Sequence, residues 1–157
     1  MSVRILFVCL GNICRSPTAE GVFRQRAAAA GLSLVKIDSA GTAGWHVGKA
    51  PDARTVKAAA RRGYDLSMLR ARQVGVDDFN AFDFILAMDE QNLAELRSIQ
   101  PAQSVAELGL FLEYAEGPVP REVPDPYYGG DQGFQTVLDL VESASDGLIR
   151  RLRGVGS

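Results

Sequence analysis

Two side chains suited to phosphate chemistry, Cys9 and Arg15, stand close together near the start of the chain. The apolar run before Cys9 is typical of a buried strand, whereas Ser16 and Pro17 are typical of a helix start, with Ser16 as the N-cap. A thiolate is nucleophilic, and a guanidinium holds phosphate oxygens through two parallel bonds. Backbone N–H groups at a helix start also favour an anion. The sequence therefore predicts a phosphate-binding loop with Cys9 at its floor.

The alternative is that Cys9 and Cys14 are inert thiols of the core, because free cysteine is among the most buried residue types. That interpretation does not explain why Asn12, Arg15 and Ser16 cluster at the end of a strand. We therefore favour the catalytic interpretation of this stretch.

The stretch resembles the active-site loop of the low-molecular-weight protein tyrosine phosphatases, in which a cysteine, five residues and an arginine are followed by Ser or Thr. Cys9, Arg15 and Ser16 match this pattern here. The resemblance implies that Cys9 is the nucleophile and that Arg15 binds the phosphate. It also implies a set of phosphate-binding positions along the loop: Leu10, Gly11, Asn12, Ile13, Cys14, Arg15 and Ser16.

A second stretch, Pro124-Asp125-Pro126-Tyr127-Tyr128, resembles the segment of that family that carries the general acid. When a thiolate attacks phosphorus, the leaving phenolate needs a proton, and the resulting carboxylate can then activate water. Asp125 is therefore expected to act as general acid and base, and its two flanking prolines restrict its backbone. By itself this stretch is an ordinary proline-rich turn; only together with the Cys9 loop does it indicate catalysis.

Further residues are expected to shape and support the site. Trp45, Tyr127 and Tyr128 are predicted to form the pocket wall, although Trp45 could instead cap the core. The loop is expected to be supported by four polar side chains: Asn12, Ser16, Ser39 and Asp89. His46 is the only histidine, but a thiolate held by N–H groups and Arg15 does not require it as a base. The family often has a histidine where Leu69 stands, so a hydrogen bond from that side chain is not expected here.

Strands alternate with helices along the chain, which predicts an α/β fold with helices on both faces of a parallel sheet. The apolar patterns predict strands over 3–8, 34–39, 82–88 and 107–112 and helices over 17–30, 51–62 and 89–99, with a last helix that begins near residue 131. The resemblance implies three layers and a four-stranded sheet of order 2-1-3-4. Cys9 would then lie at the switch point where open α/β sheets bind ligands.

The length and composition agree with one domain, and the resemblance implies that residues 1–157 form a single phosphatase domain. The net charge of −2 and the pI near 5.4 do not favour nucleic-acid binding, and no apolar run is long enough to span a membrane. We expect no signal peptide and a cytoplasmic location. We also expect a monomer, with weak self-association as the alternative. Two cysteines and one histidine do not favour a zinc site, and the expected chemistry needs no metal or other cofactor.

The proposed partners are proteins that carry phosphotyrosine, with inorganic phosphate as product. Thioredoxin-coupled arsenate reductases resemble this loop, but they need further cysteines, and none follows Cys14. Protein-arginine phosphatases have a threonine where Ile13 stands, and an apolar side chain favours an aromatic ester. A non-catalytic phosphate-binding or redox-sensing module would not need Asp125. A nucleotide-binding Gly-x4-Gly-Lys-Ser/Thr loop does not occur.

Cys14 is also a candidate redox partner of Cys9 on the same tight loop. Oxidation of Cys9 is expected to lead to a Cys9–Cys14 disulfide, which would protect the nucleophile from irreversible oxidation.

Overall fold

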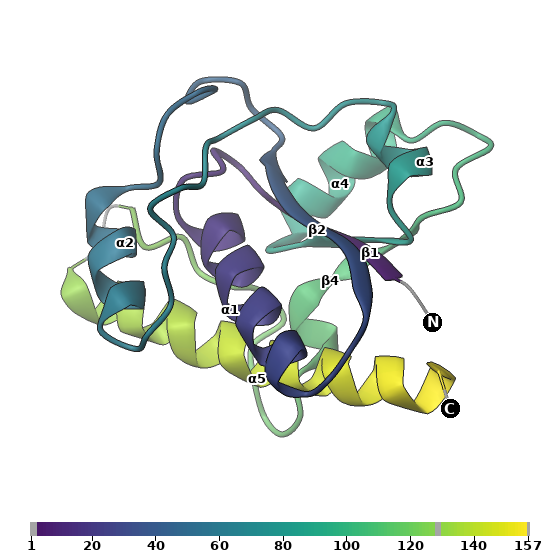
Figure 1. Cartoon of the computed structure of the whole chain (residues 1–157). Helices are drawn as coiled ribbons and strands as arrows, with labels where there is room; N and C mark the ends of the chain where they lie inside the picture. Colours follow the sequence, from purple (N-terminus) through teal and green to yellow (C-terminus); the bar gives the residue numbers. More distant parts are fainter. Residues whose placement is uncertain (1–2, 128–129, 157) are drawn as a thin grey trace.

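The computed structural model describes residues 3–127 and 130–156. Four parallel strands form a sheet of order β2-β1-β3-β4 (Figure 1), which confirms the predicted topology. In chain order the elements are β1 (Val3–Cys9), α1 (Arg15–Ala29), β2 (Leu34–Gly41), α2 (Ala53–Ala60), α3 (Asp78–Ala81), β3 (Phe84–Ala87), α4 (Glu90–Ile99), β4 (Glu107–Leu110), the 3-10 helix η1 (Phe111–Tyr114) and α5 (Asp131–Gly156).

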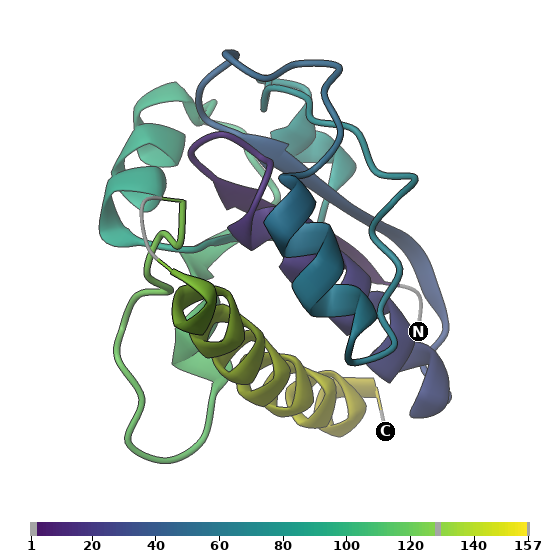
Figure 2. The ribbon, with the colours of Figure 1, turned by 90° about the vertical axis from the view of Figure 1, so that its left-hand side faces the viewer.

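Helices cover both faces of the sheet, as Figure 2 shows. The side chains of β1 alternate between the two faces, because successive residues of a strand point in opposite directions. Phe7 and Cys9 belong to the core with α1, α2 and α5, whereas Leu6 and Val8 pack with residues of α3 and α4. The predicted three layers are therefore confirmed, and β1 is buried on both faces.

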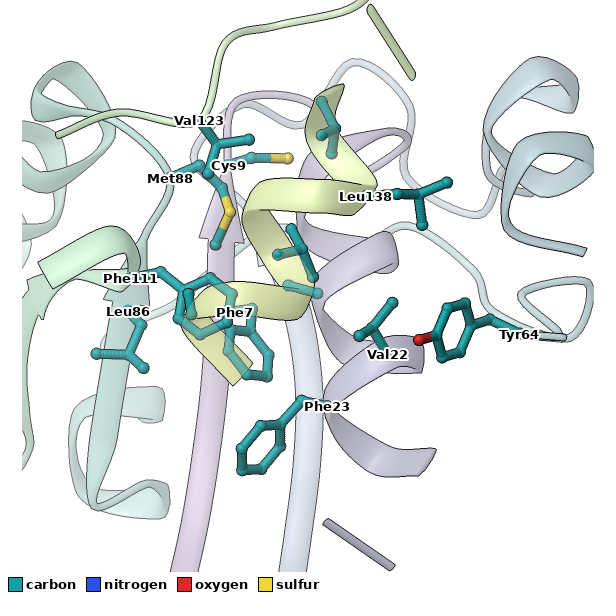
Figure 3. Packing of buried hydrophobic residues seen from close by; sticks show 14 of the residues in the cluster. Phe7, Cys9, Val22, Phe23, Tyr64, Leu86, Met88, Phe111, Val123 and Leu138 are labelled. Carbon is teal, nitrogen blue, oxygen red and sulfur yellow. The ribbon is translucent and has the colours of Figure 1, made fainter. Parts of the chain in front are cut away.

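Phe7 is the centre of the larger core. Its ring lies 5.7 Å from that of Phe23 and 4.9 Å from that of Phe111, both in edge-to-face arrangements (Figure 3). All three rings are fully buried. These contacts join β1, α1 and η1 directly beneath the end of the strand that carries Cys9, and so give the strand a rigid base.

The first helix begins earlier than the sequence predicts. Its N-cap is Cys14, without a side-chain capping bond, and its first residue is Arg15. The prediction that Ser16 is the N-cap is therefore wrong, as is the prediction that Pro17 is the first helical residue. The physical reason is that the hydroxyl of Ser16 is engaged by Cys9 and Asn12 inside the loop instead of capping the helix.

Other helix ends follow their local signals. Gly31 has φ of +77° and, with Leu32, donates back to carbonyls of the last turn of α1, which is the expected glycine stop. Asp89 caps α4 by accepting the N–H of Asn92 at 2.7 Å, as predicted. The second predicted helix is shorter than expected, because Asp52, not Pro51, provides its start by accepting the N–H of Arg54.

Among the described residues, no helix has both the length and the apolar character needed to cross a membrane.

The contact between α5 and η1 depends on Gly147. A Cβ atom at this position would overlap the carbonyl oxygen of Tyr114. We therefore expect Gly147→Ala to lower the free energy of unfolding by about 1–3 kcal/mol through overpacking. Gly154 lies in the same helix with open space around its Cα, so Gly154→Ala is expected to leave stability unchanged or raise it. Urea unfolding of the two variants measures both effects; equal stabilities would contradict this account of the packing.

Candidate active site

The residues between β1 and α1 wrap around a cavity of about 310 Å³ at the carboxyl end of the sheet. Its lining combines this loop with side chains from two distant loops: Cys9, Leu10, Gly11, Ile13, Cys14, Arg15, Trp45, His46, Asp125 and Tyr127. The cavity is thus at the switch point between β1 and its two neighbours β2 and β3. The structure brings together the two stretches that the sequence singled out, although more than a hundred residues separate Cys9 from Asp125.

Cys9 ends β1 and is buried. Its Sγ lies 3.0 Å from the Oγ of Ser16, which in turn accepts a hydrogen bond of 2.8 Å from Asn12 Nδ2. The same hydroxyl also lies 3.4 Å from the carbonyl oxygen of Ala40, so the proton of Ser16 can be donated either to that oxygen or, over the shorter distance, to Cys9. A hydroxyl donor at this distance stabilises a thiolate.

Asn12 has φ of +57°, and within residues 3–127 and 130–156 it is the only residue other than glycine with positive φ. Its side chain makes three hydrogen bonds: Nδ2 donates to Ser16 and, at 3.0 Å, to Ser39, while Oδ1 accepts the backbone N–H of Arg72 at 3.0 Å. These bonds compensate for the strained backbone and tie the loop to β2 and to the crossover before α3. Leu69, where the sequence predicts no side-chain hydrogen bond, packs against the core.

Glu20 extends this network and was not found from the sequence. It is buried on α1, accepts the hydroxyl of Ser39 at 2.7 Å and pairs with Arg24 at 2.7 Å. Burial raises its pKa above the usual value, although the bonds from Ser39 and Arg24 act in the opposite direction. A charged residue on a helix usually faces solvent, so nothing in the local sequence distinguishes Glu20 from a surface residue.

Arg15 is buried at the start of α1 and is surrounded by acceptors. Its Nη1 donates to Asp89 at 2.7 Å and to the carbonyl of Val123 at 3.0 Å, and its Nη2 lies 3.8 Å from Asp125 Oδ2. Burial disfavours its charge, but the negative charges of Cys9, Asp89 and Asp125 outweigh this effect, so the pKa of Arg15 lies above its usual value. The guanidinium therefore remains charged and fixed in direction beside Cys9.

Asp125 also lines the cavity, on the loop before α5. Its side chain is 40% exposed, and its Oδ1 accepts the N–H of Tyr127 at 3.1 Å. Trp45 lines the cavity but is 73% exposed, so its ring is open to an incoming group and does not cap the core. Tyr127 lines the cavity as well, whereas Tyr128 lies outside the described residues.

Two positions show why small or apolar residues are needed in the loop. A Cβ atom on Gly11 would lie 3.0 Å from His46 Cδ2, so glycine allows the histidine to approach. Ile13 lines the cavity with an apolar side chain, and its carbonyl accepts the N–H of Asp52 at 2.9 Å. This bond ties the loop of residues 9–16, which we call the phosphate loop, to the start of α2.

The two cysteines of the loop have different environments. Both are free and buried, and Cys14 also lines the cavity. Burial raises the pKa of Cys14 to about 12. Cys14 is therefore a neutral thiol near pH 7, whereas Cys9 has a hydroxyl donor and a guanidinium beside it. Across the part of the chain that the structure describes, no cluster of three His, Cys, Asp or Glu side chains is arranged to hold a metal ion.

Comparisons with known proteins agree with this geometry. Residues 4–155 match the family described as low molecular weight phosphotyrosine protein phosphatase, and the chain belongs to that family. It is thus a protein-tyrosine phosphatase, a hydrolase.

Relatives cover nearly the whole chain. The low molecular weight phosphotyrosine protein phosphatase of Schizosaccharomyces pombe is 48% identical over 85% of this chain and 86% of its own length. The corresponding protein-tyrosine-phosphatase of Streptomyces coelicolor is 46% identical over 98% of this chain and 95% of its own. The crystal structure of a protein tyrosine phosphatase from Entamoeba histolytica, with Hepes in the active site, has a TM-score of 0.92, 39% identity and 99% coverage of both chains.

The raised pKa of Glu20 leads to a prediction about stability. Between its ordinary and its raised pKa, the folded protein binds more protons than the unfolded chain, so the free energy of unfolding falls as pH rises through this interval. Glu20→Gln removes this titration while keeping an acceptor for Ser39. We expect the variant to lose less stability than the wild type from pH 4.5 to 7, measured by urea unfolding. Glu95→Gln, at an exposed position of α4, is the control. If the free energy of unfolding of Glu20→Gln depends on pH as that of the wild type does, the prediction is wrong.

Proposed function

We propose that this phosphatase hydrolyses phosphotyrosine through a phosphocysteine intermediate, with Cys9 as nucleophile, Arg15 as phosphate ligand and Asp125 as general acid and base. The observation that carries the proposal is that all three side chains line one cavity, with Arg15 Nη2 3.8 Å from the carboxylate of Asp125. The apolar walls of the cavity, from Ile13, Trp45 and Tyr127, suit a flat aromatic ring.

In the first step, the Cys9 thiolate attacks phosphorus, so that an S–P bond forms and the bond from phosphorus to the tyrosine oxygen breaks. Asp125 in its protonated form donates its proton to that leaving oxygen. The charge on the phosphoryl oxygens is stabilised by Arg15 and by the N–H groups of the loop. Within the described residues, no protein acceptor is hydrogen-bonded to the backbone N–H groups of residues 11–16, so these donors are available to the phosphate.

In the second step, the carboxylate of Asp125 takes a proton from water, whose oxygen bonds to phosphorus as the S–P bond breaks. Inorganic phosphate leaves, and Cys9 returns to the thiolate, which the Ser16 hydroxyl at 3.0 Å stabilises. In this scheme Asn12, Ser39 and Asp89 support the loop and the guanidinium through the bonds described above. The scheme requires neither a metal nor another cofactor.

Phosphotyrosine proteins are the substrates that the family implies. The monomeric state and the cytoplasmic location stay predictions from the sequence. Two free cysteines suit a reducing compartment.

The catalytic roles are tested by hydrolysis of a phosphotyrosine peptide with chelator present. We expect Cys9→Ser to abolish turnover, since a hydroxyl is a far weaker nucleophile than a thiolate, and Asp125→Asn to lower kcat/KM by roughly 10²–10⁴-fold. Full activity in Cys9→Ser would overturn the mechanism. Faster hydrolysis of a phosphoarginine peptide than of the phosphotyrosine peptide would instead support an arginine phosphatase.

We also propose that Cys14 protects Cys9 during oxidation. Peroxide would convert the Cys9 thiolate to a sulfenic acid with release of hydroxide; the Cys14 thiol would then displace water and form the disulfide. A thiol reductant returns two electrons and restores both cysteines.

This proposal predicts the outcome of peroxide treatment followed by dithiothreitol. The wild type is expected to regain most of its activity, whereas Cys14→Ser regains substantially less because its sulfenic acid is oxidised further. Phosphatase activity and intact mass measure the two steps. Recovery of Cys14→Ser as complete as that of the wild type would show that Cys14 has no protective role.

A further inference from the structure

Arg54, at the start of α2, contacts the loop of the proposed general acid and has no role in the scheme above. Its guanidinium is held from one side by Asp52: Nε donates to Oδ1 at 3.1 Å and Nη2 to Oδ2 at 3.0 Å. Asp52 also accepts the backbone N–H of Arg54 at 2.8 Å as the cap of α2. Two parallel bonds to one carboxylate fix the plane of the guanidinium, which a single bond would not.

The other side of the Arg54 guanidinium faces residues 115–127, the segment that carries Asp125, which we call the general-acid loop. Nη2 donates to the backbone carbonyl of Tyr127 at 2.9 Å. The guanidinium carbon also lies 5.4 Å from the centre of the Tyr127 ring and 4.9 Å from that of Phe134 on α5. Arg54 thus joins three segments that are far apart in the sequence.

These contacts complete a path between the two halves of the site. The backbone N–H of Asp52 donates to the carbonyl of Ile13 in the phosphate loop at 2.9 Å. At the other end of the path, the N–H of Tyr127 donates to Asp125 Oδ1 at 3.1 Å. The phosphate loop is therefore linked to the Asp125 side chain through Asp52, Arg54 and Tyr127.

The general-acid loop needs such an anchor. From residue 115 to residue 127, the described part of the chain before α5 has no helix or strand, and the Asp125 side chain is 40% exposed. On the N-terminal side of Asp125, Val123 is fixed by its N–H bond of 2.8 Å to the carbonyl of Met88 and by the bond from Arg15 to its own carbonyl. On the C-terminal side, Arg54 makes the corresponding bond to Tyr127.

We propose that Arg54 is a positioning residue that sets the placement of Asp125 relative to Cys9, and so controls proton donation to the leaving group. This inference rests on the proposed role of Asp125 as general acid. Misplacement by a fraction of an ångström is sufficient to weaken proton transfer, which requires hydrogen-bond reach in the transition state. Apart from the bond between Ile13 and Asp52, the phosphate loop is held by bonds of Asn12 and Arg15 in which Arg54 takes no part.

The test compares two substrates with different leaving groups in Arg54→Gln. Phosphotyrosine peptide releases a weakly acidic phenol that needs a proton, whereas 2,4-dinitrophenyl phosphate releases a strongly acidic phenol that does not. We expect kcat/KM for the peptide to fall about 10-fold or more and kcat/KM for dinitrophenyl phosphate to change less than about 3-fold. The inhibition constant of inorganic phosphate is expected to stay within about 2-fold of the wild type, because it reports the phosphate loop.

Matched variants complete the design. Arg61→Gln makes the same change at an exposed position just after α2 and is expected to behave as the wild type on both substrates. Arg54→Lys keeps the charge but not the two-bond geometry, so it should restore only part of the activity on the peptide. Addition of Arg54→Gln to Asp125→Asn is expected to cause little further loss, because both changes act through one carboxyl group.

Equal losses on both substrates in Arg54→Gln, or a weaker inhibition by phosphate, would overturn the proposal in favour of a direct substrate contact or general damage to the site. Unchanged activity on the peptide would overturn it as well. If Asp125→Asn is selective for the peptide and Arg54→Gln is not, only the positioning role fails. If Asp125→Asn shows no such selectivity, the general-acid assignment fails, and the inference about Arg54 fails with it.

Discussion

The burial of the Arg15 guanidinium beside the cavity is the constraint on which the arrangement of the loops depends. A buried charge is costly unless nearby groups of opposite charge and hydrogen-bond acceptors compensate for it. Here the compensation comes from three segments, through Asp89 at the start of α4, the carbonyl of Val123 and the carboxylate of Asp125. The side chain that we propose as the phosphate ligand is therefore also the one that holds the distant loop of Asp125 at the end of β1.

The phosphate loop itself is held by a second set of contacts. The positive φ of Asn12 directs the chain around the cavity, and its side chain exchanges bonds with Ser16, Ser39 and the backbone of Arg72. Glu20 continues this network to the surface of α1. Because the side chains of this network are buried and bonded, the loop is formed before any anion binds, which is the condition for electrostatic stabilisation without reorganisation.

The two halves of the site differ in how they are held. The phosphate loop lies between two regular elements and is held through its side chains and carbonyl oxygens. The general-acid loop has no regular structure and is attached at Arg121, Glu122, Val123 and Tyr127. This difference agrees with the proposed reaction, in which the first loop binds the phosphoryl group throughout and Asp125 transfers a proton in both steps.

The sequence by itself determined the class of fold and the stretch that carries Cys9 and Arg15, because strand and helix patterns and short motifs are local properties of the chain. The pairing of that stretch with Asp125 came from the family resemblance, and the structure places both at one cavity. The strand order followed from the family resemblance, and the structure agrees with it. Only the tertiary structure decided that Cys14 and not Ser16 is the N-cap of α1, that Glu20 is buried, and that Arg54 joins α2 to the general-acid loop. The reason is physical: a polar side chain takes its role from the partners that surround it, and those partners come from distant segments that only folding brings together.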